Sequence, residues 1–277
     1  MRKFLILVLS IGILLTVIGG VILGIAVANG KFGSVKYETK EYSTNETFTD
    51  IDIDLETIDI EFAKSSDGKV NVVYEQEDGY IYSFAVFNNS FIITNKNNTK
   101  WYERIFRWNF KSHKMTIYLT SDTYNSLKIN SSTGNIKVCD FTFNKLDLES
   151  STGNINIEKV NTLDLLNVKA STGQISLLDV NAKTATINAS TGDISLNNTI
   201  ISNNIQIEVS TGDVSFSKSD AKTIKVQTST GDITGDILSA KTFKTSTSTG
   251  RINVPDTTGE ICDLKTSTGN IIIKISE

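Results

Sequence analysis

The chain of 277 residues is poor in the residues that usually carry catalysis, with one histidine and two cysteines. The histidine, His113, has no neighbouring nucleophile in the sequence, and no group of cysteines and histidines has the spacing of a zinc site. A glycine-rich phosphate-binding loop is also missing from the sequence. These absences predict a protein that is not an enzyme and that uses no cofactor and no metal ion.

An excess of charge of one sign is also lacking, because 27 basic residues against 31 acidic residues leave a formal net charge of −4. A nucleic-acid partner usually requires a strongly basic surface. Proline occurs once, at Pro255, and no long low-complexity linker interrupts the chain. We therefore expect one sizeable folded body with an appendage, and we expect no nucleic acid as its partner.

Charged residues are absent from residues 4–28, a stretch of 25 residues, whereas a helix needs about 20 apolar residues to cross the hydrocarbon core of a membrane. Arg2 and Lys3 precede this stretch, which favours a cytoplasmic N-terminus. Residues 1–30 are therefore predicted to be a cytoplasmic tip and a transmembrane signal-anchor helix, with the rest of the chain outside the cytoplasm. The segment AVA before Asn29 resembles a cleavage site, so a cleaved signal peptide stays an alternative.

The sequence is rich in the motif Ser-Thr-Gly, which occurs eight times between residues 130 and 270. Successive copies are 19 or 20 residues apart, and a fixed period near 20 indicates stacked supersecondary units. Apolar residues alternate with polar residues on both sides of each glycine, which is typical of half-buried strands. The eight glycines are predicted to be structural turn residues with a positive φ: Gly134, Gly153, Gly173, Gly192, Gly212, Gly231, Gly250 and Gly269.

A unit of this length cannot bury its own apolar face, so neighbouring units must stack to make a continuous core. We therefore predict an all-β fold, a single parallel β-solenoid of 19–20-residue coils whose regular part covers residues 127–277. Hydroxyl groups near the turn can then hydrogen-bond from coil to coil. In this arrangement Cys139 and Cys262 would lie about 29 Å apart, which is too far for a disulfide.

Three successive coils carry an aspartate after the glycine, namely Asp193, Asp213 and Asp232. Carboxylates stacked at strand spacing repel one another, and a bound cation would relieve that repulsion. Gln174 and Arg251 interrupt the same column, and the signature of a calcium-binding β-roll is missing. We therefore favour a solvated acidic face over a calcium site.

Residues 31–126 lack the motif but keep the alternation of apolar and polar residues, with turn signals at Asp67-Gly68 and Asn88-Asn89. A solenoid needs atypical terminal units that cover its core and its strand edges. We therefore predict that this part forms degenerate N-terminal coils and a cap of the solenoid.

Residues 100–114 differ from the rest of the chain because they combine aromatic and basic side chains. One interpretation is an insertion whose aromatic rings pack on the solenoid. The other is a contact site for an anionic membrane surface, a wall polymer or an envelope protein, since this composition suits interfaces. The residues of the predicted contact are Trp101, Arg104, Arg107, Trp108 and Lys111.

The units from SSTGNI to TSTGRI, each flanked by alternating strands, are similar to those of the bacterial DUF4097 family over residues 45–275. Members of this family are often labelled adhesins. The resemblance implies a β-helix-like domain on a protein of the bacterial envelope, and it supplies no catalytic residues to transfer to this chain.

We therefore expect a single-pass protein of the bacterial cell membrane with an extracytoplasmic, non-enzymatic β-solenoid for binding, adhesion or envelope sensing. Its partners would be the membrane and an envelope polymer or envelope protein. A polysaccharide-acting β-helix enzyme is the alternative. Such an enzyme should interrupt the repeat with a cluster of acidic or basic side chains, whereas the outward positions are mostly Asn, Ser, Thr and Asp.

Overall fold

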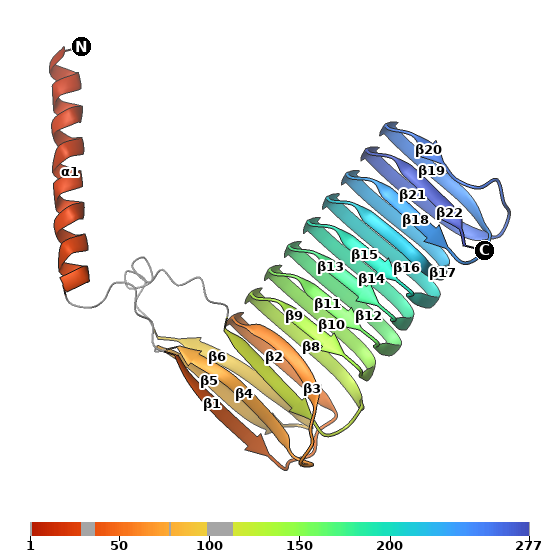
Figure 1. The fold of residues 1–277 in the computed structure, drawn as a ribbon, viewed down its shortest axis with the longest axis horizontal. Helices are drawn as coiled ribbons and strands as arrows, with labels where there is room; N and C mark the ends of the chain where they lie inside the picture. Colours follow the sequence, from red (N-terminus) through yellow and green to blue (C-terminus); the bar gives the residue numbers. More distant parts are fainter. Residues whose placement is uncertain (1, 29–36, 78, 99–112, 277) are drawn as a thin grey trace. The chain divides into compact units, whose positions relative to one another are not determined.

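The computed structural model describes residues 2–28, 37–77, 79–98 and 113–276, and the chain divides into two compact units. The first unit contains the helix α1 (Arg2–Ala28), and the second contains the coils (Figure 1). Among the described residues, no helix is both long enough and apolar enough to span a membrane. The structure therefore does not confirm the predicted transmembrane helix.

All other elements in the described part of the chain are β-strands. Their bounds are β1 (Tyr37–Thr44), β2 (Asp50–Thr57), β3 (Asp59–Lys64), β4 (Val70–Glu77), β5 (Tyr80–Phe87), β6 (Ser90–Asn97), β7 (Lys114–Leu119), β8 (Thr123–Thr133), β9 (Ile136–Cys139), β10 (Thr142–Thr152), β11 (Ile155–Glu158), β12 (Asn161–Thr172), β13 (Ile175–Leu178), β14 (Asn181–Thr191), β15 (Ile194–Asn197), β16 (Ile200–Thr211), β17 (Val214–Thr230), β18 (Ile233–Ile237), β19 (Lys241–Thr249), β20 (Ile252–Asn253), β21 (Glu260–Thr268) and β22 (Ile271–Ile275).

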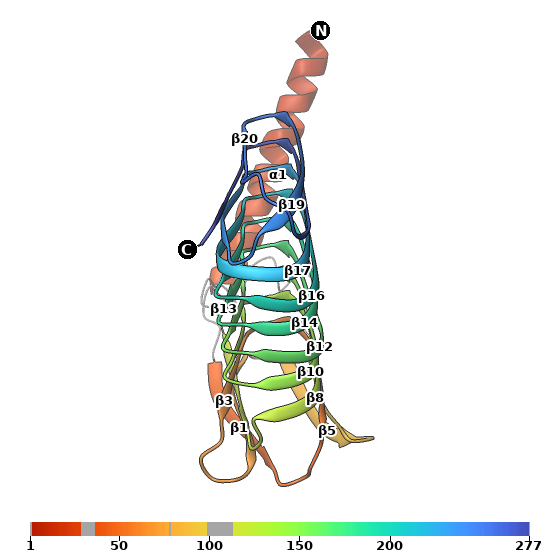
Figure 2. The same ribbon diagram turned by 90° about the vertical axis from the view of Figure 1, so that its right-hand side faces the viewer.

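Each regular coil contributes one short strand and one long strand, and the two kinds of strand stack into two parallel sheets (Figures 1 and 2). The side chains of Ile136, Ile155, Ile175 and Ile194 follow one another in register along the short strands, and each is 0% exposed. Residues one repeat apart are therefore direct neighbours, and the predicted parallel β-solenoid is confirmed. The core lies between the two sheets.

The last coil of the chain is not the last coil of the stack. In the long-strand sheet, β21 pairs with β17 on one side and with β19 on the other. In the short-strand sheet, β22 pairs with β18 and with β20 in the same way. The coil that contains Gly269 is thus inserted between the coils of Gly231 and Gly250. This order differs from the simple sequence order that the repeat predicts.

The last two coils differ in burial, because an outermost coil is covered from one side only. The outermost coil has Thr245 at an inward position, and its Ile252 is 45% exposed. Their register partners in the inserted coil, Leu264 and Ile271, are each 0% exposed. The observed order keeps the Leu264 side chain fully out of water, which contributes about 1.5–3 kcal/mol. It also leaves Phe243 of the outermost coil half-buried, opposite the buried Cys262 of the inserted coil.

A buried lysine of the outermost coil reaches past the inserted coil and contacts the coil of Gly231. Lys241 is 2% exposed, and its Nζ atom lies 3.0 Å from Asp220 Oδ1. The same ammonium group donates to the Ala221 carbonyl oxygen at 2.6 Å. Because the charge is both paired and hydrogen-bonded, its burial is compensated.

The N-terminal end of the solenoid has a similar insertion. β2 lies between β6 and β8, and β3 lies between β7 and β9. β4 runs antiparallel to β7 on the outer side. Asn88 and Asn89, where the sequence signals a turn, have φ of 49° and 65° between β5 and β6. The coil with β2 and β3 and the coil with β21 and β22 are therefore each paired with neighbours on both sides.

Cysteine pairs distinguish the observed order from the sequence order. Gln227 on β17 and Lys265 on β21 are register partners, so their Cα atoms are about 4.8 Å apart, a separation that a disulfide can span. In a background without Cys139 and Cys262, we expect the pair Gln227→Cys and Lys265→Cys to form a disulfide under mild oxidation. Mass spectrometry of the unreduced protein measures the cross-link.

The matched control for this experiment is the pair Gln227→Cys and Ser246→Cys, which sequence order would make neighbours. In the observed order one strand separates these positions, and a gap of about 9.6 Å is too wide for a disulfide. Preferential cross-linking of the control pair would show that the last coil is not inserted.

Candidate functional site

The Ser-Thr-Gly corners bring the backbones of successive coils into direct contact. Gly192 has a φ of 138°, and a Cβ atom at this position would lie 2.1 Å from the carbonyl oxygen of Gly173. The N–H of Gly192 donates to the Thr211 carbonyl oxygen of the next coil at 2.9 Å. All eight corner glycines have φ between 137° and 153°, so this edge of the solenoid leaves no room for a side chain.

Hydroxyl side chains beside the corner divide into an inner and an outer set. The inner set consists of the hydroxyl side chains three residues before the glycine. Thr266 Oγ1 donates to the Gly231 carbonyl oxygen at 3.0 Å, and Thr247 Oγ1 donates to the Gly269 carbonyl oxygen at 3.0 Å. These inner hydroxyls hydrogen-bond one coil to the next. The serine two residues before the glycine is exposed in every copy, and these serines form a row along the solenoid: Ser132, Ser151, Ser171, Ser190, Ser210, Ser229, Ser248 and Ser267.

The residue after the glycine forms a ladder of side-chain-to-backbone hydrogen bonds. Asp193 Oδ1 accepts the N–H of Asp213 at 2.9 Å, and Asp213 Oδ1 accepts the N–H of Asp232 at 2.7 Å. Asp232 Oδ1 accepts the N–H of Asn270 at 2.6 Å. The stacked aspartates therefore join successive coils. Within the described ranges, no three His, Cys, Asp or Glu residues are grouped so that they could hold a metal ion.

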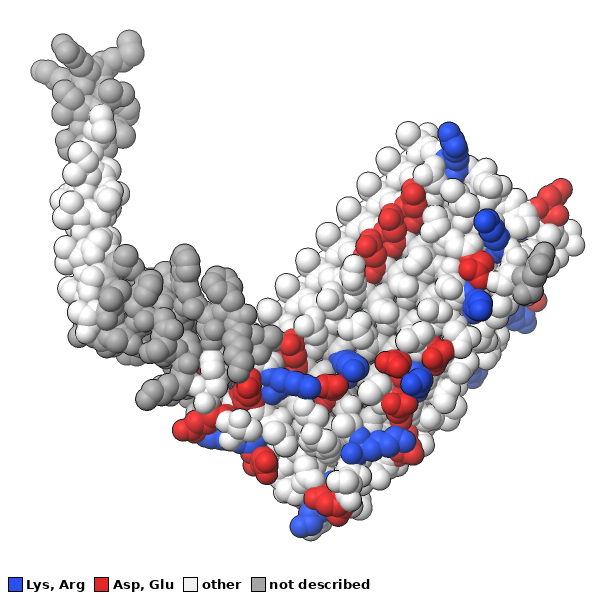
Figure 3. Space-filling view, in the orientation of Figure 1, with Lys and Arg blue, Asp and Glu red and all other residues white. Residues whose placement is uncertain are grey.

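The charged side chains on the face drawn in Figure 3 are spread over many coils. One short row of acidic side chains follows the stacking direction, and elsewhere on this face acidic and basic side chains are interspersed. A mixed surface of this kind does not create a large field of one sign. The described residues of this face thus give no support to a strongly basic or strongly acidic partner.

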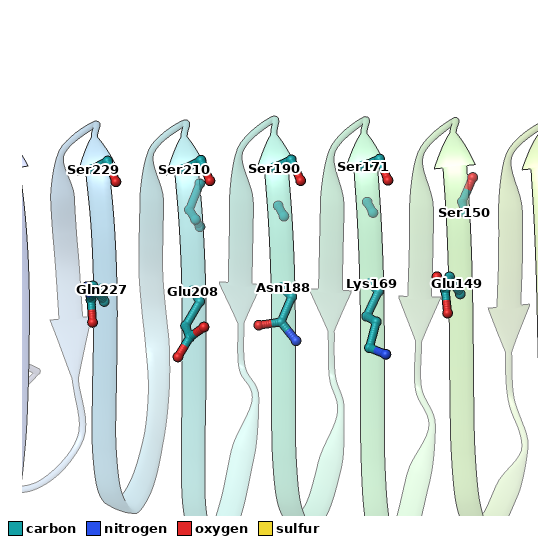
Figure 4. Close-up of a pocket in the computed structure, with 13 residues that line it drawn as sticks. Glu149, Ser150, Lys169, Ser171, Asn188, Ser190, Glu208, Ser210, Gln227 and Ser229 are labelled. Atoms are coloured by element: carbon teal, nitrogen blue, oxygen red, sulfur yellow. The ribbon is translucent and has the colours of Figure 1, made fainter.

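A groove of about 530 Å³ runs across five successive coils on the outer face of the long-strand sheet (Figure 4). One wall is the serine row, and the other is the row of residues four positions before the glycine. The backbone between the rows makes the floor, because the residue between them points its side chain into the core, as at Ala170, Ala189 and Val209. The walls are formed by Ser171, Ser190, Ser210 and Ser229 on one side and Glu149, Lys169, Asn188, Glu208 and Gln227 on the other.

The groove is polar, but its acidic groups are not placed for glycoside hydrolysis. Glu149 and Glu208 are three coils apart, a separation of about 14 Å, whereas the two carboxyl groups of a glycosidase are about 5–9.5 Å apart. Elsewhere, neither cysteine forms a disulfide or is an activated nucleophile. Burial raises the pKa of the Cys139 thiol, and it raises the pKa of Cys262 to about 12. The arrangement suits binding through hydroxyl, amide and charged groups.

The residues that the sequence predicts as a contact site, namely Trp101, Arg104, Arg107, Trp108 and Lys111, lie outside the described residues. Their role therefore stays a prediction. Sequence reasoning treated the serines as part of a turn and missed the groove. A signal was present, since serine fills one position in all eight copies and the position two residues before it is polar throughout.

Comparison with known proteins finds one matching family and several similar folds. The family model described as Toastrack DUF4097 matches residues 48–208 and 201–276. A "putative adhesin" from Bacteroides fragilis has a similar crystal structure, with a TM-score of 0.56 and 22% identity, covering 87% of this chain and 98% of that chain. Another "putative adhesin", from Parabacteroides merdae, has a TM-score of 0.51 and 16% identity over 87% and 98% of the two chains. No curated protein matches this chain.

Replacing Asp213 separates the structural role of the aspartate ladder from a cation site. Asp213→Ala removes the acceptor for the N–H of Asp232, and we expect the free energy of unfolding to fall by about 1 kcal/mol. Asp213→Asn keeps an oxygen acceptor and removes repulsion between stacked carboxylates, so stability should stay the same or rise. Urea unfolding with and without calcium measures both effects. A stabilisation by calcium that Asp213→Asn abolishes would contradict the structural role.

Proposed function

This chain belongs to the Toastrack DUF4097 family, and on that premise we propose that it is a non-enzymatic binding scaffold of the bacterial cell envelope. The observation that carries the proposal is the groove, whose two polar rows repeat across five coils. A polymer lying along the coils would meet the same kind of contact at each step, so that weak contacts add up along its length. The scaffold would then act through repetition rather than through one deep pocket.

The names of similar proteins support a binding role. Two solved structures with the same fold are those of proteins described as a "putative adhesin". We extend adhesion to this chain in a restricted sense, as attachment of the solenoid to a polymer or protein of the envelope. The wide separation of Glu149 and Glu208 also favours binding over a polysaccharide-acting enzyme.

We further propose that residues 4–28 anchor the scaffold in the cytoplasmic membrane, with the solenoid outside. This stretch contains no charged residue. Apolar side chains of α1 are exposed, for example Ile13 at 62% and Leu15 at 64%. Exposed apolar side chains on a helix require a cover, and the acyl chains of a membrane provide one. An anchor of this kind would hold the groove where it meets envelope polymers.

Filling the groove tests the binding role. Ser190→Gln together with Ser210→Gln places longer side chains in the groove without disturbing the core, because both serines are exposed. We expect the full-length protein to sediment with cell-wall material isolated from the bacterium that produces it. The double variant should bind this material about tenfold more weakly. Sedimentation over a range of wall concentrations measures the apparent Kd.

Ser195→Gln is the matched control for the groove variant. Ser195 is exposed in the same coil as Ser190 but lies on β15, in the other sheet. Its replacement should leave the association unchanged. If the double variant and the control bind the wall material equally well, the groove is not the binding surface.

The anchor is tested by the mature N-terminus of the protein. We expect the protein to remain in the membrane fraction with residues 1–28 attached, because the uncharged stretch is longer than a signal-peptide core of about 7–15 residues. Intact-mass spectrometry of the extracted protein measures this directly. A mature protein that begins at Asn29 would show cleavage and rule out the anchor.

A further inference from the structure

We propose that the groove binds an uncharged, extended glycan strand, with about one sugar unit to each coil. This assignment rests on the proposed binding function and names the class of its ligand. The first support is that the serine-row hydroxyls of the groove have no hydrogen-bond partner among the described residues. The hydroxyls of Ser171, Ser190 and Ser210 are exposed and make no hydrogen bond to any described part of the chain. They are free to bond a ligand, and Figure 4 shows them in one line across the coils.

The opposite wall of the groove carries groups that complement the serines. Asn188 and Gln227 present side-chain amides, and Glu149 and Lys169 present charges of opposite sign (Figure 4). Amide and hydroxyl groups both donate and accept hydrogen bonds, as the hydroxyl groups of a sugar do. A glycan between the two rows could therefore be hydrogen-bonded from both sides at successive coils.

The spacing of the rows suits a linear glycan. Successive coils are separated by the inter-strand distance, about 4.8 Å. The rings of an extended β-1,4-linked glycan repeat at a similar length, and each ring is turned by about half a turn from the one before. Each ring can therefore meet one coil, and the same contact recurs at every second coil. Across the five coils of the groove the rows span about 19 Å, which is room for about four or five sugar units.

Other linear polymers fit the groove less well. Glu149, Lys169 and Glu208 together carry one negative charge, which disfavours a phosphate-rich polymer. An extended polypeptide binds a sheet through backbone hydrogen bonds at an edge strand. The strands beneath the groove are instead paired with neighbouring strands on both sides.

The groove residues also predict how the affinity depends on ligand length. Among the described residues that line the groove, none is aromatic, so no single ring-stacking contact dominates the binding. Each sugar would add a few weak hydrogen bonds, and the sum of such contacts grows until the ligand fills the site. Length dependence is therefore the property that distinguishes this site from a pocket for one sugar.

Oligosaccharides of increasing length test the assignment. The full-length protein in detergent micelles is titrated calorimetrically with β-1,4-linked N-acetylglucosamine oligomers, from the dimer to the hexamer. We expect Kd to fall with each added sugar and to level off at the pentamer, when the ligand spans the groove. For the hexamer, Ser190→Gln should raise Kd by about tenfold. Ser195→Gln should leave it unchanged.

Three results would overturn the assignment. The first is binding that is undetectable or independent of oligomer length. The second is equal binding by Ser190→Gln and Ser195→Gln. The third is binding of inorganic polyphosphate in place of the oligomers, which would indicate an anionic ligand. The cell-wall sedimentation assay separates these failures from failure of the proposed function, because it can succeed when no oligosaccharide binds.

Discussion

The backbone contact between successive Ser-Thr-Gly corners is the constraint on which the rest of this structure depends. Each corner glycine from Gly134 to Gly231 donates its N–H to a threonine carbonyl oxygen of the adjacent coil at 2.9–3.0 Å. Each of them also lies so close to the preceding corner that a Cβ atom cannot be placed. Because every pair of coils must meet at this point, a slip of one residue would break the contact and would turn each apolar side chain outward. The inward ladder of isoleucines follows from this alignment.

A fixed register turns each column of the repeat into a row on the solenoid. The inward columns form the core, and the column after the glycine joins the coils through bonds such as that from the Asp213 N–H to Asp193. The serine column and the column two residues before it neither form the core nor join the coils. These are the two columns that form the groove. A ligand site of regular spacing is therefore available without any departure from the repeat.

The coil length, the inward isoleucines and the turn at the glycine could be predicted from the sequence, because each copy contains its own alternation and its own corner. The order of the end coils could not, since all copies carry the same motif and pairing alone does not select neighbours. The contacts that accompany the observed order, such as the full burial of Leu264 and the ion pair of Lys241 with Asp220, are visible only in the structure. One sequence signal for the observed order is Thr245, the polar residue in the column that holds Leu264, whereas Phe243 in the column that holds Cys262 favours the opposite order. The groove was missed because an outward serine looks the same in sequence whether it faces open solvent or the opposite wall of a groove.

The unfolding free energy of Gly192→Ala, compared with that of Ser190→Ala, tests the role of the corner contact most directly. The alanine methyl group would meet the Gly173 carbonyl oxygen, and φ would be strained, so we predict a loss of about 3 kcal/mol or more. Ser190 is exposed two residues away, and its replacement should change the stability by less than about 0.5 kcal/mol. Chemical denaturation of both variants beside the parent protein gives the comparison. A loss in Gly192→Ala no larger than that in Ser190→Ala would contradict the account.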